Sequence, residues 1–586
     1  MIRTPLAALL LASLLLAPGV GAAAGIEVTV TGVEGALRDN VLALLSLQRH
    51  SRAPDLDAEL VDRLLRRAPR EVAAALRPFG YYEPVVETSL RQGRDAWEAL
   101  ISVEPGPPVV LRSHDIVLEG PGRDEPFLQE ALARAPLRPG ARLSHADYDQ
   151  LKGELQRSAA ANGYLDATFT RAELRVDPAA HSAIAQLRFT TGARYRFGAT
   201  TIEQDFLRPA FVARYLRYRP GDWYDADSLL RTQFALDDSH YFAVVEVLPE
   251  DRDRTALTVP IRIRAEPNRR NLYTVAAGYA TDTRARGTLG WENRRLNARG
   301  HRLRAELRGS STEESARLAW VIPWSDPALE KLSLELRGLR EERADIETTG
   351  GSFRVALAQV QGRWQRSLSL TADATRDEIA VSSEDLTRIE SRRSRLLVPG
   401  IAYTLLPSGF LGLDAVPRGL HAELLGSATA LGSDTNFLRL VLRDERRFRL
   451  ADRWHLQLRG EAGTSLVGDF QELPAQYRFF AGGDRSVRGY AWEELSPLDA
   501  NGNRIGGRHL LAMSAELQRD LPRNLVAALF ADAGNAVNSF GDPLEYSAGV
   551  GLRYRLPFLS IGLDVAQSLS ERDRGPRLHL HFAPEF

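Results

Sequence analysis

The acidic and histidine residues of this sequence do not group into a catalytic site or a metal site. Asp499–Asn503 begins like a calcium-binding loop, but its sixth position is Arg504 and its twelfth is Leu510, where such a loop needs Gly and Glu. His579 and His581 lie two apart, which places both on one face of a strand as polar side chains rather than around an ion. No G-x-S-x-G, P-loop or H-E-x-x-H motif is present. We therefore expect no enzyme and no bound metal or cofactor.

Composition narrows the class of protein further. The chain has 586 residues, a net charge of −1, 44% hydrophobic residues and no cysteine. That length predicts at least two domains, and the charge does not favour nucleic-acid binding. A helical membrane protein would be far more apolar, and a chain without cysteine has neither disulfides nor thiolate metal sites. A chain without thiols also suits passage through an oxidising compartment in an unfolded state.

The N-terminus is typical of a secretory signal peptide. Arg3 supplies a positive charge, Leu6–Leu16 is almost purely apolar, and Gly21–Ala24 offers small residues for cleavage. The apolar run is shorter than the roughly 20 residues that a spanning helix needs. We expect residues 1–24 to be removed on export, and we expect no transmembrane helix in the mature chain.

Residues 25 to 267 repeat an order of elements about every 80 residues, which indicates a tandem array. Each unit opens with a short strand, continues with amphipathic helices and ends in two more strands. A helix stop with an aromatic residue recurs in all three units, and an Arg-Pro-Gly turn recurs in the last two. These segments are Gly80-Tyr81-Tyr82, Gly163-Tyr164-Leu165, His240-Tyr241-Phe242, Arg138-Pro139-Gly140 and Arg219-Pro220-Gly221. The predicted boundaries are 25–111, 112–192 and 193–267.

From about Asn268 the helical period disappears and apolar residues alternate with polar ones, as in strands. Examples are Leu303, Ala305, Leu307; Leu332, Leu334, Leu336; Phe353, Val355, Leu357; and Trp454, Leu456, Leu458. The region 268–586 is long enough for 16 strands at roughly 20 residues per strand and loop. In lipid an open sheet would leave unpaired backbone groups, so the sheet must close. The sequence therefore predicts α+β repeats followed by a 16-stranded transmembrane antiparallel β-barrel, in preference to a soluble β-sandwich.

Several segments of the second half resemble the POTRA-plus-barrel superfamily of outer-membrane assembly proteins. The segment Gly482–Tyr490 is similar to that superfamily's V-R-G-F/Y loop motif, and Phe530–Asn535 is similar to its F-x-D-x-G strand motif. Gly278–Asp282 and the ending Phe582–Phe586 resemble its TamA-like subgroup. Members of that subgroup carry three POTRA domains, and the sequence has three repeats. One departure is Arg284, where TamA-like chains usually have Gly.

The resemblance implies that the loop bearing the first motif folds back into the barrel lumen. Arg488 would then form a bidentate ion pair with Asp532 on the inner wall. Gly489 would allow close approach of the backbone, and Tyr490 would add contact area and a hydroxyl group. The predicted loop lock comprises Val487, Arg488, Gly489, Tyr490, Phe530, Asp532 and Gly534. Without the two motifs, a solvated arginine and a turn aspartate would be the simpler interpretation.

The last strand is the second expected functional element. Leu578, Leu580, Phe582 and Phe586 have one parity and resemble a β-signal, although they would also simply face lipid. Pro584 removes one donor from the hydrogen-bond ladder close to the seam between the first and last strands. A weak seam could open sideways and template an incoming strand by β-augmentation. The resemblance implies such a lateral gate.

These expectations lead to a TamA-like insertion factor for autotransporters and other barrel proteins. By resemblance, its partners would be a TamB-like protein anchored in the inner membrane, nascent barrel clients and outer-membrane lipid, but no nucleic acid. The POTRA repeats would lie in the periplasm and the barrel in the outer membrane. The alternatives are a two-partner secretion exporter and a general barrel-assembly protein of the same superfamily.

Overall fold

The computed structural model describes residues 25–53, 56–93, 96–282, 284–383, 386–406, 419–556, 559–571 and 573–583. The expected signal peptide, Pro584 and Phe586 lie outside the described residues. The chain divides into two compact units. The first runs through Phe197 and includes Gly221–Ala226 and Arg252–Val259, and the second contains the remaining residues from Gly198 to Phe586. No α-helix among the described residues is both long and apolar enough to cross a membrane.

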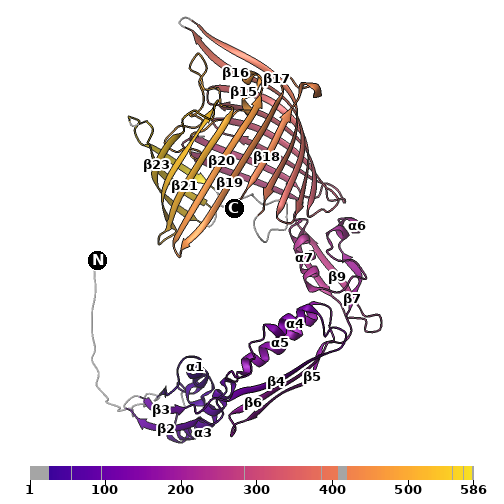
Figure 1. Ribbon diagram of the computed structural model, residues 1–586, viewed down its shortest axis with the longest axis vertical. Coiled ribbons are helices and arrows are strands. Elements are labelled where there is room, and N and C mark those ends of the chain that lie inside the picture. The colour runs from indigo at the N-terminus through magenta and orange to yellow at the C-terminus, as the bar shows by residue number, and fades with distance from the viewer. Residues whose placement is uncertain are drawn as a thin grey trace, which may run out of the picture. The chain divides into compact units, whose positions relative to one another are not determined.

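Three small sheets precede the barrel, and in each the last strand along the chain lies in the middle. Their strand orders are β1-β3-β2, β4-β6-β5 and β7-β9-β8 (Figure 1). In the first two sheets the opening strand pairs in parallel with the central strand, and the other edge strand pairs antiparallel. The strands are β1 (Gly25–Thr31), β2 (Val85–Gln92), β3 (Ala96–Glu104), β4 (Val110–Glu119), β5 (Thr168–Asp177), β6 (Ser182–Thr190), β7 (Arg196–Glu203), β8 (Phe242–Pro249) and β9 (Thr258–Pro267).

The two longest helices of these repeats, α3 and α5, begin at polar caps. The side chain of Asp57 accepts a hydrogen bond from the Leu60 N–H at 2.7 Å, and Ser144 accepts one from the Asp147 N–H at 3.2 Å. Each bond satisfies a donor that the first helical turn leaves free. The helices are α1 (Gly35–Leu44), α2 (Ser46–Arg49), α3 (Ala58–Leu76), α4 (Pro126–Ala133), α5 (His145–Ala161), α6 (Pro209–Val212) and α7 (Ala226–Asp237).

The recurring helix stop has one backbone geometry in all three repeats. Gly80 and Gly163 adopt left-handed φ values of 87° and 89°, as a glycine at this position permits. His240 occupies the same place in the third repeat with a φ of 57°. The aromatic residue that follows is buried in the second and third repeats, where Tyr164 is 3% and Tyr241 1% exposed. The residue at the helix stop therefore adopts a left-handed conformation in every repeat, even in the third, where it is not glycine.

Burial changes the acidity of the tyrosine in the second repeat. The Tyr164 hydroxyl donates to the Glu125 carboxylate at 2.8 Å. Desolvation and this hydrogen bond raise the pKa of Tyr164 to about 12. The group therefore stays protonated and available as a donor at neutral pH.

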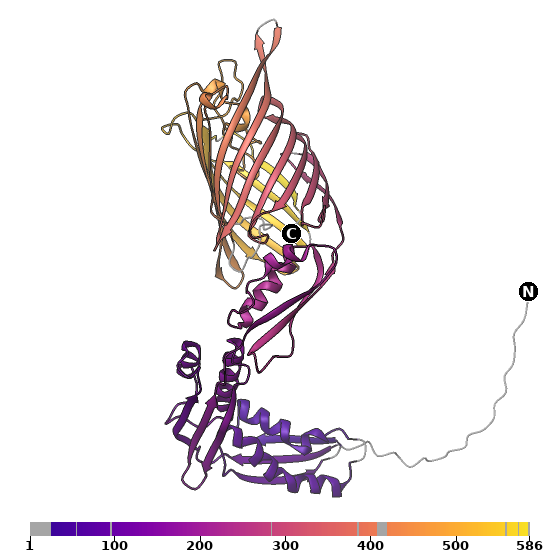
Figure 2. The same ribbon diagram turned by 90° about the vertical axis from the view of Figure 1, so that its right-hand side faces the viewer.

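Sixteen antiparallel strands close into a barrel in simple up-and-down order from β10 to β25 (Figures 1 and 2). The hairpin of β16 and β17 has the longest strands, of 20 residues each, and extends past its neighbours. The strands are β10 (Asn271–Ala280), β11 (Arg284–Asn293), β12 (Arg302–Gly309), β13 (Glu313–Pro323), β14 (Glu330–Arg343), β15 (Ile346–Gln361), β16 (Trp364–Ser383), β17 (Leu386–Leu405), β18 (His421–Ser427), β19 (Phe437–Ala451), β20 (Trp454–Val467), β21 (His509–Asp520), β22 (Leu525–Val537), β23 (Glu545–Leu556), β24 (Leu559–Ser568) and β25 (Arg577–Ala583).

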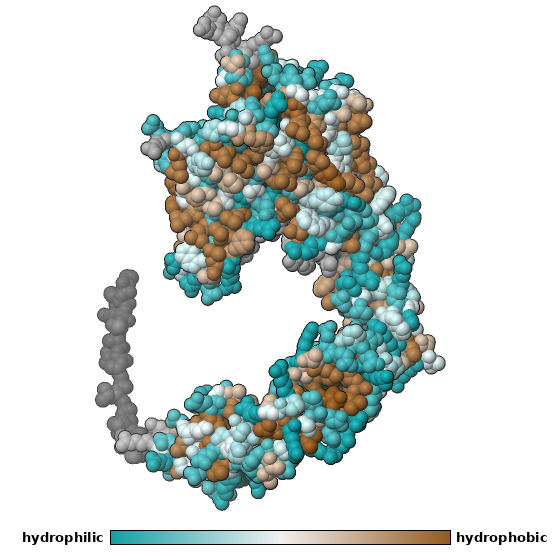
Figure 3. All heavy atoms as spheres, in the orientation of Figure 1, coloured by the Kyte–Doolittle hydropathy of each residue, from teal (hydrophilic) through white to brown (hydrophobic). Residues whose placement is uncertain are grey.

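The period-two pattern in the sequence corresponds to the two faces of the barrel wall. Along β21, residues 510, 512, 514, 516 and 518 are buried, whereas Met513 on the other face is 46% exposed. Large apolar side chains such as Leu307 and Leu336 are more than half exposed on the outside. Figure 3 shows hydrophobic residues gathered over the visible face of the barrel wall. An apolar exterior around a polar interior is the arrangement of a lipid-embedded barrel.

The third repeat packs directly on one end of the barrel. Arg302, at the start of β12, is 3% exposed, donates a hydrogen bond to the Ser239 carbonyl and lies 4.6 Å from the Tyr241 ring centre. The Tyr241 hydroxyl donates to the Gly300 carbonyl, beside β12. The third repeat is therefore joined to the first strands of the barrel by buried polar contacts.

A second set of contacts holds the same end. Arg217 binds Asp326 between β13 and β14 through both terminal nitrogens, at 2.5 and 3.3 Å. Arg214 donates to the Ser325 carbonyl at 3.1 Å. Charge-assisted bidentate pairing of this kind fixes orientation as well as distance.

Two residues next to strands adopt left-handed backbone conformations without being glycine. Leu257 lies one residue before β9 with a φ of 52°. Arg284, which stands where the TamA-like subgroup usually has Gly, adopts a φ of 53° at the start of β11. The first barrel hairpin therefore keeps a left-handed backbone at this position without glycine, at a cost of roughly 1 kcal/mol.

Candidate functional site

The loop between β20 and β21, residues 468–508, folds back into the barrel and is called the lumen loop below. Its side chains Phe479, Ala481, Val487, Tyr490 and Leu495 are all under 10% exposed. They pack with inward residues of the wall in one apolar cluster, which also contains Val441, Leu510, Ala512 and Ala536. An apolar core inside the barrel explains why the loop stays in the lumen and is not solvated outside it.

Arg488 lies at the centre of the contact between the lumen loop and the wall. Its Nε donates to Asp532 Oδ2 at 2.8 Å and its Nη2 to Asp532 Oδ1 at 2.9 Å. The remaining three N–H groups go to Glu516, Asp564 and Ser514, at 2.8, 3.2 and 3.1 Å. All five guanidinium N–H groups therefore have acceptors, which a lysine could not match.

A second arginine offsets part of the negative charge at this site. Arg553 of β23 binds Glu516 at 2.5 Å and Asp564 at 3.4 Å. Three carboxylates thus face two guanidinium groups. Arg488, Glu516, Asp532 and Asp564 are each at most 6% exposed. Because burial of an unpaired charge is costly, the acidic side chains depend on Arg488 as much as Arg488 depends on them.

The aromatic ring of Phe530 packs against the guanidinium group of Arg488. The Arg488 Cζ lies 3.4 Å from the Phe530 ring centre. A Cβ at Gly534 would lie 2.4 Å from the Leu511 carbonyl oxygen and 3.1 Å from the Val487 side chain. The structure therefore brings together six of the seven residues of the predicted lock. The seventh, Tyr490, contacts a neighbouring part of the wall.

Tyr490 anchors the loop two residues beyond Arg488. Its hydroxyl donates to Glu545 Oε2 at 2.7 Å and also lies 2.8 Å from Ser568 Oγ. Arg574 lies over the ring at 4.8 Å and binds Glu494 of the loop at 2.7 and 2.9 Å. The segment 488–494 is therefore held by residues of β21 to β24 and of the turn that follows β24.

Gly489 lies against the wall in a backbone conformation that other residues adopt at a cost. Its φ is 98°, and a Cβ would lie 3.3 Å from both Ser547 Cβ and Ser568 N. We expect Gly489→Ala to destabilise the seated loop by about 1–3 kcal/mol through strain and crowding. The measurement is the urea concentration at which the purified barrel unfolds.

Gly502 provides a matched control within the same loop. Its φ is 84°, but no atom lies within 4 Å of the position that a Cβ would take. Gly502→Ala introduces backbone strain alone and is expected to cost about 1 kcal/mol. Equal effects of the two substitutions would show that crowding at the wall makes no contribution at Gly489.

The lumen loop also reaches the β14–β15 hairpin. Glu493 is 6% exposed, has a left-handed φ of 54° and accepts a hydrogen bond from the Ala344 N–H at 3.1 Å. The Arg504 N–H donates to Asp345 at 2.7 Å. Sequence analysis did not identify these contacts, because Glu493 and Asp345 belong to no motif.

The seam between β10 and β25 has the fewest registered pairs in the part of the barrel wall that the structure describes. The β10–β11 hairpin has ten registered pairs and β24–β25 has seven, whereas the described residues of β10 and β25 share the one pair Ala280 and His581. Three further hydrogen bonds cross it among the described residues. They are Thr281 N to Leu580 O at 3.1 Å, Leu580 N to Thr281 Oγ1 at 3.3 Å and Arg286 Nη2 to Phe582 O at 3.3 Å. The seam therefore closes the barrel with few backbone hydrogen bonds.

The last strand has its apolar side chains on the outside and His579 on the inside. Leu578 is 52% exposed, Leu580 and Phe582 are partly exposed, and His579 is completely buried. The exposed face is the one predicted as a β-signal. It is available both to lipid and to a partner that recognises this strand.

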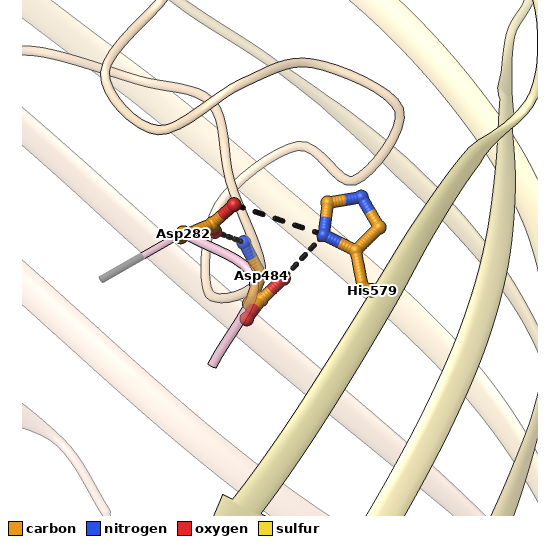
Figure 4. A group of neighbouring side chains, drawn as sticks. All are labelled: Asp282, Asp484 and His579. Atoms are coloured by element: carbon orange, nitrogen blue, oxygen red, sulfur yellow. Dashed lines mark hydrogen bonds and ion pairs between the residues drawn. The ribbon is translucent and has the colours of Figure 1, made fainter. Parts of the chain in front are cut away.

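His579 meets two aspartates at the point where the lumen loop crosses the seam (Figure 4). Asp282 lies in the turn after β10, and Asp484 lies in the lumen loop. Asp282 Oδ2 accepts a hydrogen bond from the Asp484 N–H at 2.7 Å, and His579 Nδ1 is hydrogen-bonded to Asp484 Oδ1. The three groups have the ligand types and spacing of a metal site. Sequence analysis missed this cluster, because its members lie on three segments far apart in the chain.

The chain matches two family models. Residues 296–583 match the Omp85 superfamily domain, and residues 27–105 match POTRA domain TamA domain 1. A curated relative, the outer membrane protein assembly factor BamA of Nitratidesulfovibrio vulgaris, is 24% identical over 60% of this chain and 45% of its own length. The chain thus spans about half the length of the curated relative that it matches.

Two solved structures are similar to the chain. The crystal structure of BamA from Haemophilus ducreyi lacking POTRA domains 1–3 has a TM-score of 0.66 at 14% identity and covers 81% of this chain and 99% of its own. CdiB from Acinetobacter baumannii has a TM-score of 0.46 at 13% identity and covers 81% of this chain and 89% of its own. The first likeness supports the fold. The matches place the barrel in the outer membrane and the repeats in the periplasm, and they indicate a non-enzymatic protein.

Proposed function

We propose that this chain, a TamA-like protein of the Omp85 superfamily, inserts other barrel proteins into the outer membrane through its own seam. The observation that carries the proposal is that the described residues of β10 and β25 share a single registered pair, whereas the other neighbouring strands of the wall are paired over five or more residues. When these two strands separate, each exposes unpaired backbone groups in lipid. An incoming strand can satisfy those groups by β-augmentation, because unpaired N–H and C=O groups are costly there.

The proposal extends to clients and partners. Autotransporters and other outer-membrane barrels are the proposed clients, and a TamB-like inner-membrane-anchored protein is the proposed partner of the periplasmic repeats. The match of residues 27–105 to a TamA-type POTRA model supports docking at the first repeat. The domain boundaries at residues 111, 192 and 267 belong to the same proposal, as does the role of Leu578, Leu580, Phe582, Pro584 and Phe586 as a β-signal.

A disulfide across the seam tests this mechanism. The chain has no cysteine, so Ala280→Cys with His581→Cys gives one defined pair at the registered position of the seam. Oxidation is expected to abolish insertion of a purified autotransporter barrel into liposomes that contain the protein, and reduction is expected to restore it. The reason is that a covalent bond prevents the two strands from separating.

The matched control is a disulfide within the continuous wall. Leu552 and Leu563 are registered partners on β23 and β24, and both are exposed. Leu552→Cys with Leu563→Cys should leave insertion unchanged in both redox states. Full insertion by the oxidised seam variant would reject the lateral gate. Retained export of a soluble filamentous substrate by that variant would instead favour the two-partner secretion alternative, in which substrate passes through the lumen.

A further inference from the structure

The lumen loop has contacts on both sides of the seam. Arg488 and Tyr490 hold it to β21–β24, which lead to the last strand. On the other side, the Asp484 N–H donates to Asp282 in the first barrel hairpin. A Cβ at Gly483 would lie 2.7 Å from Asp282 Oδ2, so the loop backbone packs tightly on this carboxylate. The loop therefore bridges the two strands that must part if the seam opens.

His579 on β25 uses both ring nitrogens on the lumen loop. Its Nε2 accepts a hydrogen bond from the Gly489 N–H at 3.2 Å, and its Nδ1 faces Asp484 Oδ1 and, at 4.0 Å, Asp282 Oδ1. The side chain of His579 is 1% exposed and that of Asp282 is 2% exposed. Separation of β25 from β10 must therefore break either the loop's contact to Asp282 on the β10 side or its contacts to His579 on the β25 side.

The hydrogen bonds fix where the imidazole proton lies. A backbone N–H can only donate, so Nε2 carries the lone pair and Nδ1 carries the proton of the neutral ring. Nδ1 then donates to Asp484. A metal ion at Nδ1 would need that lone pair and would move the proton to Nε2, where it would face the Gly489 N–H. The geometry thus favours a hydrogen-bonded contact over a metal site, although Asp282 Oδ1 is buried without a hydrogen-bond partner.

We infer that Asp282 and His579 are positioning residues that couple closure of the seam to seating of the lumen loop. With the loop seated, a buried polar side chain on each side of the seam is hydrogen-bonded to the loop: Asp282 after β10 and His579 on β25. With the loop displaced, Asp282 and His579 lose their hydrogen bonds to the loop, and among the described residues Asp282 keeps only its longer contacts to His579 and Arg577, at 4.0 and 3.9 Å, across the seam. Release of the loop and opening of the seam therefore become one event. This inference rests on the proposed function only in giving seam opening a role.

The test measures the seam and the loop in the full mature chain in lipid nanodiscs, without any client. Leu289 on β11 and Val565 on β24 face outward on opposite sides of the seam, and each is replaced by a spin-labelled cysteine. The distance between the labels reports the seam, and the rate of tryptic cleavage inside the lumen loop reports seating.

Asp282→Ala is expected to shift the labels to longer distances and to raise loop cleavage about tenfold or more, the factor for loss of a charge-assisted hydrogen bond. Asp282→Asn keeps an acceptor for the Asp484 N–H and should stay close to wild type in both measurements. Asp542→Ala removes an aspartate that accepts two backbone N–H bonds in another turn, and it should change neither. If Asp282→Ala does not fold, His579→Ala answers the same question.

The inference is overturned if the alanine variants change only one of the two measurements, or neither. It is also overturned if EDTA opens the seam of the wild-type protein and stoichiometric Zn²⁺ closes it, because the three residues would then act as a metal site. Failure of insertion assays does not affect this test, since no client takes part. Conversely, a negative result here leaves the disulfide experiment on the proposed function unaffected.

Discussion

Arg488→Ala is expected to release the lumen loop and expose it to protease added outside intact cells. The substitution removes the Arg488 ion pair of the buried Asp532 and leaves Glu516 and Asp564 paired with Arg553. Truncating one partner of such a buried network costs about 3–5 kcal/mol, because the other charges stay desolvated. Arg488→Lys should recover only part of this loss, since an ammonium group has three donors where the guanidinium uses five.

The control for this experiment lies three residues away. Arg485 belongs to the same loop and is exposed. Arg485→Ala removes one charge and one tryptic site, so cleavage should be followed with a protease that does not require arginine. Protection of the loop in Arg488→Ala equal to that in Arg485→Ala would show that the buried network does not hold the loop.

The second large effect is expected at the junction of the third repeat with the barrel. Arg302→Ala removes the donor to the Ser239 carbonyl and the cation over the Tyr241 ring. It also removes a counter-ion of Glu292, which lies 3.6 Å from Arg302 Nη1. We expect the contact to weaken by about 3–5 kcal/mol, because both acceptors lie in a desolvated interface. Hydrogen–deuterium exchange of α7 and of the segment before β8 should rise accordingly.

Arg304→Ala is the comparison for this substitution. Arg304 lies two residues further along β12, also binds Glu292, at 3.1 Å, and has a side chain that is 41% exposed. Its removal should leave exchange in the third repeat close to wild type. If exchange rises equally in both variants, then loss of charge around Glu292, and not the contact to Ser239 and Tyr241, controls the junction.

The barrel was predictable because each strand carries its own signal. Side chains alternate between lipid and lumen with period two, so short windows such as Leu332, Leu334 and Leu336 indicate strands without knowledge of their neighbours. The pair of Arg488 and Asp532 could be predicted from the sequence for a different reason, since both residues belong to motifs of a known superfamily. The structure places them in direct contact.

The other residues of the site are brought together by the register between neighbouring strands, which could not be predicted from the sequence. Glu516 and Asp564 are single acidic residues in otherwise ordinary strands, and only the pairing of β21 to β24 brings them to Arg488. Asp282 and His579 meet because the barrel closes on itself. Nothing local distinguishes His579 from any polar residue facing a lumen, so sequence analysis gave it no role.

Sequence separation within the lumen-loop contacts has a consequence for how the chain folds. Arg488 is 28, 44 and 76 residues from Glu516, Asp532 and Asp564, whereas Thr281 and Leu580 at the seam are 299 residues apart. Because loop-closure entropy falls with sequence separation, the free energy of closing the Thr281–Leu580 contact is less favourable than that of the Arg488 contacts by roughly 1–2 kcal/mol. The last third of the chain can therefore organise around the arginine before the ring is complete. The lumen loop then occupies the nascent barrel as a plug before β10 and β25 first pair.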